Sequence, residues 1–223
     1  MPGEEVRREV AYLVARRAIM GILVVKLDNK NITDLDKCDS EFVINSKIVP
    51  SYEDGSLSYT VVDVPVYKKR YEPEKRDYTD YINYSSKTAY LAYFDGKITG
   101  QVILRENWNK FCLVEDIRVD KKHRRQGIGG ELMDRAITWA KYRGFPGVMV
   151  ETQDTNVGAC RLYESCGFIL GGFDTCLYKD SVVYGDEIAL FWYLIFKRDY
   201  KNPISPLVEA MPFIPDEMPD DIF

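Results

Sequence analysis

The feature that most constrains this chain is a basic, glycine-rich segment between a predicted strand and a predicted helix. Residues 117–130 read IRVDKKHRRQGIGG, with five bases and one acid between positions 118 and 125. The strand covers 111–119, and the helix covers 130–142, where apolar residues recur at helical spacing. Glycines let the backbone approach a ligand closely, and the free N–H groups of a helix's first turn favour an anion. The segment predicts a pyrophosphate site, and the simpler alternative is a tight turn with a solvated basic face.

The remaining segments predict an α/β fold in which helices flank a mixed sheet. Asp95-Gly96 predicts a tight hairpin turn, and residues 70–80, with four acids, three bases and Pro73, predict an exposed loop. Further strands are expected at 21–27, 56–62, 88–94, 97–105, 147–152 and 188–196, and further helices at 5–17, 31–37 and 156–166.

The composition argues against several kinds of chemistry and location. His123 is the only histidine, so neither a Ser-His-Asp triad nor a multi-histidine zinc site is expected. The five cysteines form no C-x-x-C pair, which indicates free thiols in a reducing cytoplasm and no metal site. No apolar stretch reaches the about 20 residues of a membrane span. Acids and arginines near the start do not fit a secretory signal, so we expect a cytoplasmic protein without a membrane partner.

The net charge of −5 arises entirely at the C-terminal end. Residues 1–201 hold 30 bases and 30 acids, whereas residues 202–223 hold five acids and no base. A duplex-binding surface is therefore not expected, and no nucleic-acid partner is predicted. The chain is expected to comprise a helical extension at 1–19, a main domain at 20–200, and an acidic, proline-rich tail at 201–223.

Two motifs resemble those of the GNAT acetyltransferase superfamily. The spacing Arg124-x-x-Gly127-x-Gly129 after a strand is similar to the superfamily's acetyl-CoA pyrophosphate loop. It lacks the ending of a nucleotide P-loop and the third spaced glycine of the dinucleotide fingerprint. The second motif is Asn156-x-x-Ala159-x-x-x-Tyr163-Glu164-x-x-Gly167-Phe168. The resemblance implies the GNAT fold, with a mixed central sheet, flanking helices and a splayed strand pair at the acetyl-CoA site.

Four further strings are similar to those of streptothricin (nourseothricin) acetyltransferases within this superfamily. They are NWN at 107–109, VEDIRV at 114–119, ETQD at 151–154 and GFDTCLY at 172–178, within a resemblance covering roughly residues 40–196. Residues 1–30 and the acidic tail have no counterpart. The loop at 70–80 is strongly acidic in some relatives, but here it contains Arg70, Lys75 and Arg76. The resemblance therefore does not assign that loop the binding of a cationic antibiotic.

The resemblance implies acetyl-CoA as cosubstrate. Residues 115–119 would splay from the strand that begins at Gly147 and admit the pantetheine along the backbone. The Val119 amide would stabilise the developing oxyanion. The expected cofactor-binding residues are Ile117, Val119, Arg124, Arg125, Gln126, Gly127, Ile128, Gly129, Gly130, Asn156 and Ala159.

The implied reaction is direct attack of an amine on the thioester. Tyr163 is the predicted general acid for the departing thiolate, and the alternative is a core tyrosine. Glu115 is the predicted general base, on the strand face of Ile117 and Val119. The alternative is that Glu115 only holds the cationic substrate while water takes the proton. Asp116, expected on the opposite face from Glu115, is predicted to be structural.

Three further residues are predicted to bind substrate. For Asp154 and Asp174 the alternative is a surface aspartate near a turn. Trp108 is predicted to wall the acceptor pocket, and its alternative is a place in the core. His123 is expected to be a solvated loop residue beside the phosphates.

The resemblance thus implies an enzyme that acetylates a primary amine of a streptothricin-type antibiotic, on its β-lysine arm, and so confers resistance. The expected partner is a small cationic amine, and a homodimer is left open. Two other functions stay open. One is acetylation of a peptide, protein or other small amine, and the other is a non-catalytic module that binds acetyl-CoA.

Overall fold

A computed structural model describes residues 21–71, 77–181 and 185–196. The predicted helix at 5–17, the extension at 1–19 and the tail at 201–223 lie outside the described residues. None of the helices in the described ranges is long and apolar enough to cross a membrane.

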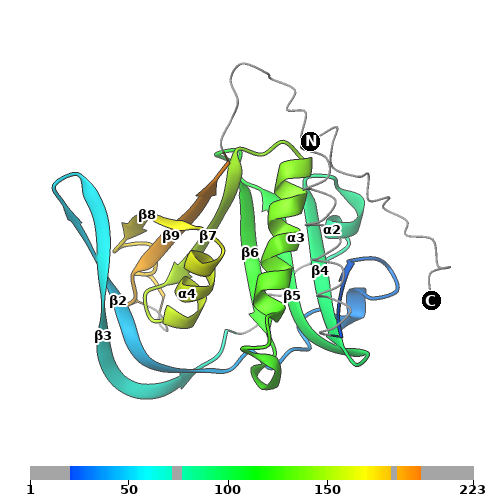
Figure 1. Cartoon of the computed structure of the whole chain (residues 1–223), viewed down its shortest axis with the longest axis horizontal. Coiled ribbons are helices and arrows are strands. Elements are labelled where there is room, and N and C mark those ends of the chain that lie inside the picture. Colours follow the sequence, from blue (N-terminus) through cyan, green and yellow to red (C-terminus); the bar gives the residue numbers. More distant parts are fainter. Residues whose placement is uncertain (1–20, 72–76, 182–184, 197–223) are drawn as a thin grey trace, which may run out of the picture.

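The centre of the fold is a mixed sheet (Figure 1). Its strand order is β1 (Ile22–Lys26), β4 (Lys87–Phe94), β5 (Lys97–Glu106), β6 (Cys112–Val119), β7 (Gly147–Gln153), β9 (Ala189–Ile195) and β8 (Ile169–Asp174). Strands β6 and β7 are parallel, and the other neighbouring strands are antiparallel. A separate curved ribbon consists of β2 (Phe42–Glu53) and β3 (Ser56–Lys69).

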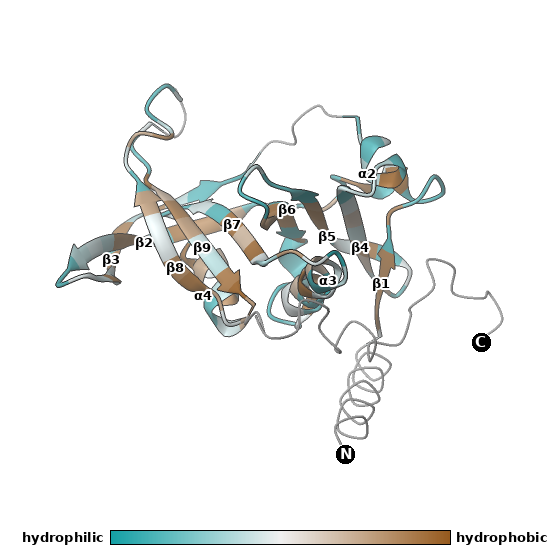
Figure 2. Ribbon diagram, turned by 90° about the horizontal axis from the view of Figure 1, so that it is seen from above, coloured by the Kyte–Doolittle hydropathy of each residue, from teal (hydrophilic) through white to brown (hydrophobic). Residues whose placement is uncertain are grey.

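Helices cover the two faces of the sheet unequally. The long helix α3 (Ile128–Tyr142) and α4 (Val157–Ser165) lie on one side, and the short α2 (Asp80–Asn83) lies on the other (Figure 2). Two 3₁₀ turns, η1 (Ile32–Asp34) and η2 (Lys121–His123), complete the described elements.

Each face of the sheet has its own apolar core. The main core packs α3 and α4 on the sheet, and it includes Leu132, Met133, Tyr163 and Trp192. A smaller core on the opposite face joins Tyr81 of α2 to Leu91 and Ile103 of the sheet. We call the side of the second core the α2 face.

Most of the predicted elements are confirmed. Six expected strands begin and end within one residue of observed strands. In chain order, β1, β4, β5, β6, β7 and β9 correspond to the strands expected at 21–27, 88–94, 97–105, 111–119, 147–152 and 188–196. The strand at 56–62 lies inside β3, and the helices at 130–142 and 156–166 correspond to α3 and α4. Asp95 and Gly96 form the predicted turn with φ of 48° and 70°, the left-handed backbone that such a turn requires.

One expected element is wrong, and two strands were not expected. Residues 31–37 contain only the short turn η1 rather than a helix. The described residues of the expected loop at 70–80 form neither helix nor strand until α2 begins at Asp80, the last of them. The two unexpected strands are β2 and β8. Pro50 and a register shift between Ile44 and Ser46 interrupt the alternation of β2, and adjacent glycines at 171 and 172 lower the strand preference of β8.

Candidate active site

Strands β6 and β7 separate part-way along their length. Their ladder runs from Cys112↔Val148 to Val114↔Val150 and ends there, although β6 continues to Val119 and β7 to Gln153. Each strand stays paired with its other neighbour, so the two backbones diverge rather than fray. This is the predicted splay, and an extended ligand could bond to the unpaired backbone between the strands.

A β-bulge marks the start of the splay. Asp116 pairs with Ile103 and Val114 pairs with Leu104, which leaves Glu115 as the extra residue on β6. The bulge shifts the alternation of side chains, so Glu115 and Asp116 both face the α2 side. Ile117 and Val119 instead pack on the main core.

The contacts of the two acids correct the expected faces. Glu115 accepts hydrogen bonds from the Tyr81 hydroxyl and from Arg105 Nε, the latter at 2.8 Å. Asp116 accepts from Gln101 Nε2 at 2.7 Å and pairs with Arg118. The expectation that Glu115 shares a face with Ile117 and Val119, opposite Asp116, is therefore wrong. Regular strand periodicity cannot reveal a bulge.

The glycine-rich turn has the predicted form. Gly127 precedes α3 with φ of 85°, and Arg125 also has a positive φ of 64°. Gly129 packs against Leu162, since a Cβ there would lie 3.0 Å from that side chain, whereas a Cβ at Gly130 would meet nothing within 4 Å. The first turn of α3, with Ile128 and Gly130, thus presents backbone without a blocking side chain, which suits a pyrophosphate.

The basic residues of this turn do not form the single cluster that their spacing suggested. Arg118 pairs with Asp116 on the α2 face, and Lys121 Nζ lies 2.6 Å from Asp39. The side chains of Lys122, Arg125 and Gln126 are exposed beside the turn.

Arg124 is turned into the protein. Its guanidinium donates to the backbone carbonyls of Val119, Glu41 and Ser40 at 3.1, 2.9 and 2.9 Å. These bonds tie the turn to the end of β6 and to the start of β2. Arg124 therefore positions the loop, and the backbone amides with Arg125 remain available to an anion.

Tyr163 on α4 lies in the main core at 3% exposure, between the rings of Phe168 and Trp192. Burial raises the pKa of its hydroxyl, so the phenol stays protonated at neutral pH. The sequence-based alternatives are thus not exclusive, because a core tyrosine can also donate a proton. Asn156 caps α4 by accepting a hydrogen bond from the Ala159 amide at 3.2 Å.

Glu151 on β7 is a residue that the sequence reasoning missed. It follows the last β6–β7 pair, and its neighbours Val150 and Thr152 face the opposite side, so Glu151 lies on the α2 face with Glu115. Burial raises the pKa of the Glu151 carboxyl to about 7. Its carboxylate accepts a hydrogen bond from the Tyr178 hydroxyl. The string ETQD contains this residue, but only the strand register identifies its face.

The three predicted substrate residues do not gather at the splay. Asp154 is 1% exposed, and its Oδ1 accepts from the Ile188 amide at 3.2 Å. Asp174 caps a turn by accepting from the amides of Cys176 and Leu177 at 2.7 and 3.1 Å. Trp108 is 87% exposed in the turn before β6, at the end of that strand opposite the splay, so the core alternative is wrong.

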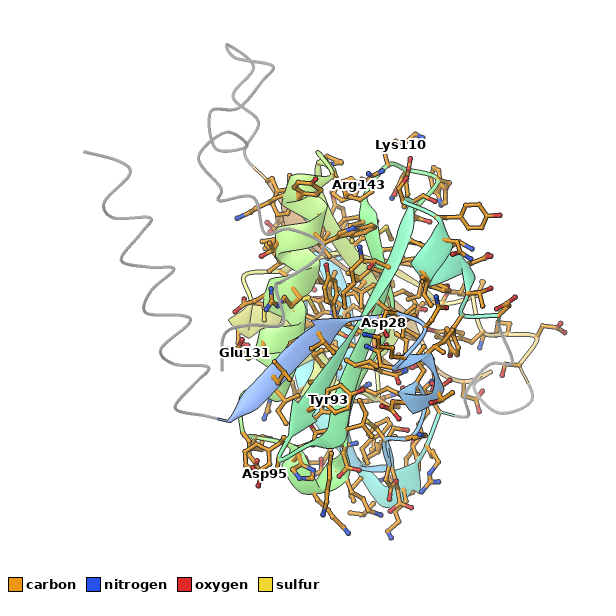
Figure 3. All side chains as sticks on the ribbon, turned by 90° about the vertical axis from the view of Figure 1, so that its right-hand side faces the viewer. Asp28, Tyr93, Asp95, Lys110, Glu131 and Arg143 are labelled. Carbon is orange, nitrogen blue, oxygen red and sulfur yellow. The ribbon has the colours of Figure 1, made fainter. Side chains whose placement is uncertain are left out.

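Other features of the described residues lie apart from the splay. His123 is half-buried, with Nδ1 3.2 Å from Asp120. A groove of about 460 Å³, lined in part by Leu23, Asp28 and Tyr93, lies along the opposite edge of the sheet at β1. Figure 3 labels Asp28 and Tyr93 at this edge. In the described ranges, no three His, Cys, Asp or Glu side chains are grouped to hold a metal ion.

Comparison with known proteins agrees with this geometry. Residues 57–168 match the acetyltransferase (GNAT) family. The chain is 38% identical to streptothricin acetyltransferase A of Bacillus subtilis over 175 residues, which are 78% of this chain and 100% of that protein.

Two solved structures are also similar. One is a protein from Bacillus anthracis assigned as a streptothricin acetyltransferase, in complex with acetyl coenzyme A, with 39% identity and a TM-score of 0.73 over 80% of this chain and 99% of that chain. The other is a nourseothricin acetyltransferase, with 25% identity and a TM-score of 0.66 over 78% of this chain and 98% of that chain. The chain belongs to the GNAT acetyltransferase family and is an N-acetyltransferase that uses acetyl-CoA.

Proposed function

We propose that this enzyme acetylates a primary amine of a streptothricin-type antibiotic, on its β-lysine arm, and so confers resistance. The observation that carries the proposal is the placement of Glu115 and Glu151 on one face, on the two strands that separate. Two carboxylates at this point suit an acceptor that carries positive charge. The full-length similarity to streptothricin acetyltransferase A supports the choice of antibiotic.

Glu151 is the better general base of the two carboxylates. A base should have a pKa close to the working pH, and burial places the pKa of Glu151 at about 7. The Tyr178 hydroxyl, which donates to Glu151, fixes the orientation of the carboxylate. Glu151 would take the proton of the incoming ammonium and free the nitrogen lone pair for attack.

Glu115 is better suited to hold the substrate cation than to move its proton. It already accepts hydrogen bonds from Arg105 and Tyr81, which fix the orientation of its carboxylate. The role first expected of Glu115 as base therefore passes to Glu151, and Glu115 keeps its alternative role as an anionic anchor.

The remaining steps use groups on the other side of the splay. The amine nitrogen forms a bond to the thioester carbon, and the Val119 amide donates to the oxyanion that develops. When the carbon–sulfur bond breaks, the nitrogen loses its second proton to water, and Tyr163 donates its proton to the departing thiolate. Gly127, Gly130 and Arg125 hold the pyrophosphate.

The test is an assay of the purified protein with acetyl-CoA and nourseothricin. We expect release of free CoA together with a nourseothricin product heavier by one acetyl group. A panel of peptide amines, protein amines and simple diamines is assayed in parallel. CoA release with peptides at a higher kcat/KM than with nourseothricin would replace the antibiotic by a peptide acceptor, and acetyl-CoA binding without turnover of any amine would indicate a binding module.

A further inference from the structure

The α2 face of β7, β9 and β8 carries two aromatic rings beside Glu151. Glu151 pairs with Phe191 and Met149 pairs with Tyr193, and directly paired residues share a face of a sheet. The intervening Leu190 and Trp192 are buried in the main core, which confirms that Phe191 and Tyr193 point the other way. Helices α3 and α4 lie on the far side of these strands (Figure 2). Both rings are only half-buried.

Gly171 gives this surface its shape. A Cβ at Gly171 would lie 2.5 Å from Cδ2 of Tyr193, so the tyrosine ring rests directly on the bare backbone of β8. The rings of Phe111 and Tyr193 pack edge-on, at 5.4 Å between centroids. Gly171 and Phe111 thus both help to hold Tyr193 in place. We call Phe191, Tyr193 and Gly171 the aromatic platform.

The negative group beside the aromatic platform is the carboxylate of Glu151, the direct neighbour of Phe191. Glu115 lies on the same face across the splay, where it pairs with Arg105. A ring face attracts cations through its quadrupole, and an adjacent carboxylate adds to that attraction. The surface therefore complements a group that is positively charged and flat or ring-shaped. It is continuous with the splay, so one ligand could reach both.

We propose that the aromatic platform binds a positively charged ring of the acceptor, beyond the amine that is acetylated. The inference rests on the proposed function, because it assigns the remainder of the antibiotic to the surface beside the splay. Glu151 and Glu115 receive the reacting arm, while Phe191 and Tyr193 stack on a flat, positively charged ring of the acceptor. Such contacts made far from the reacting bond favour long acceptors over short ones.

The test compares a long acceptor with a short one in matched variants. Gly171→Ala introduces a methyl group that displaces the Tyr193 ring, and Phe191→Leu removes the other ring. Gly172→Ala is the control, because its Cβ would lie 4.0 Å from the Phe191 ring, an ordinary contact. The acceptors are nourseothricin and β-lysine amide, the latter lacking the rings.

We expect Gly171→Ala and Phe191→Leu each to lower kcat/KM for nourseothricin about tenfold, through KM. The values for β-lysine amide and for acetyl-CoA should change less than about twofold. Gly172→Ala should match the wild type with both acceptors. Equal losses with the long and the short acceptor, or no loss with nourseothricin, would overturn the aromatic platform as a subsite.

Calorimetric binding of nourseothricin to the protein with bound CoA separates this inference from the proposed function. If the wild type binds but does not acetylate nourseothricin, and Gly171→Ala weakens binding, the proposed function fails and the aromatic platform stands. If acetylation occurs and binding is unchanged in both variants, the aromatic platform fails and the function stands. No binding and no acetylation would overturn both. Tyr193→Leu, which avoids the steric clash, replaces Gly171→Ala if the latter does not fold.

Discussion

Tyr178 donates a hydrogen bond to Glu151, which joins the connection between β8 and β9 to the point where β6 and β7 separate. The contact orients a carboxylate that burial has already brought to a pKa of about 7. A strand end that is unpaired on one side thus carries a buried acid whose pKa lies near neutral pH.

Glu151→Gln should abolish the acidic limb of the pH profile. In the wild type, kcat/KM should rise with pH through about 7, because a base works only after its own proton has left and the pKa of Glu151 is about 7. The variant should lose roughly 100-fold in kcat near neutral pH and regain rate only where free amine becomes abundant. The measurement is kcat/KM from about pH 5 to 10, a range that covers the titration of both the Glu151 carboxyl and the acceptor amine.

Glu115→Gln is the matched comparison for the base. It should raise the acceptor KM and leave the limb near pH 7 in place. If the limb disappears in Glu115→Gln and persists in Glu151→Gln, the two roles are exchanged.

Tyr163→Phe should lower kcat about 100-fold while the folded protein keeps its stability to within about 1 kcal/mol. The residue is 3% exposed between Phe168 and Trp192, and phenylalanine preserves those ring contacts. Steady-state assays and urea unfolding give the two quantities. An unchanged kcat near neutral pH would show that the thiolate leaves without an acid and that Tyr163 serves only the core.

Arg124→Ala should lower stability, whereas Arg125→Ala should weaken the binding of acetyl-CoA. Arg124 holds three backbone carbonyls, so its loss should lower the free energy of unfolding by about 2 kcal/mol. Arg125 is exposed, and its loss should leave stability unchanged but raise the KM for acetyl-CoA. Urea unfolding and acetyl-CoA titration separate the two effects. The assignment fails if Arg124→Ala retains full stability and loses only acetyl-CoA affinity.

Lys69→Met should lower the free energy of unfolding by about 3 kcal/mol, because it leaves the Glu187 carboxylate buried and unpaired. The Lys69 and Glu187 side chains are 7% and 12% exposed, with Nζ 2.5 Å from Oε2. The double variant Lys69→Met/Glu187→Gln should recover part of that loss. Lys110→Met, which breaks the exposed pair with Glu106, is the control and should cost less than about 1 kcal/mol. Equal losses in the two lysine variants would contradict the role of burial.

Sequence patterns predicted the elements that rest on local signals. The helical face of α3, the left-handed turn at Asp95-Gly96 and the glycine turn before Ile128 all follow from residue types and spacing, and the structure has each of them. The family also followed from sequence, because two motifs at the right separation are specific where either alone is not. Strand β8 was not predicted, because Gly171 and Gly172 do not favour a strand by themselves and gain their conformation from pairing with β9.

The sequence by itself determined the α/β class, the glycine-rich turn before α3 and the family, because these depend on local backbone preference and on short motifs. Only the tertiary structure decided which acids share the splay. The bulge at Glu115 turns that side chain to the α2 face. The β6–β7 ladder ends just before Glu151, and the register of β7 and β9 places Glu151 next to Phe191. It also decided that Arg124 binds carbonyls of the protein itself. The physical reason is that register and burial arise from contacts between segments far apart in the chain, which no local pattern encodes.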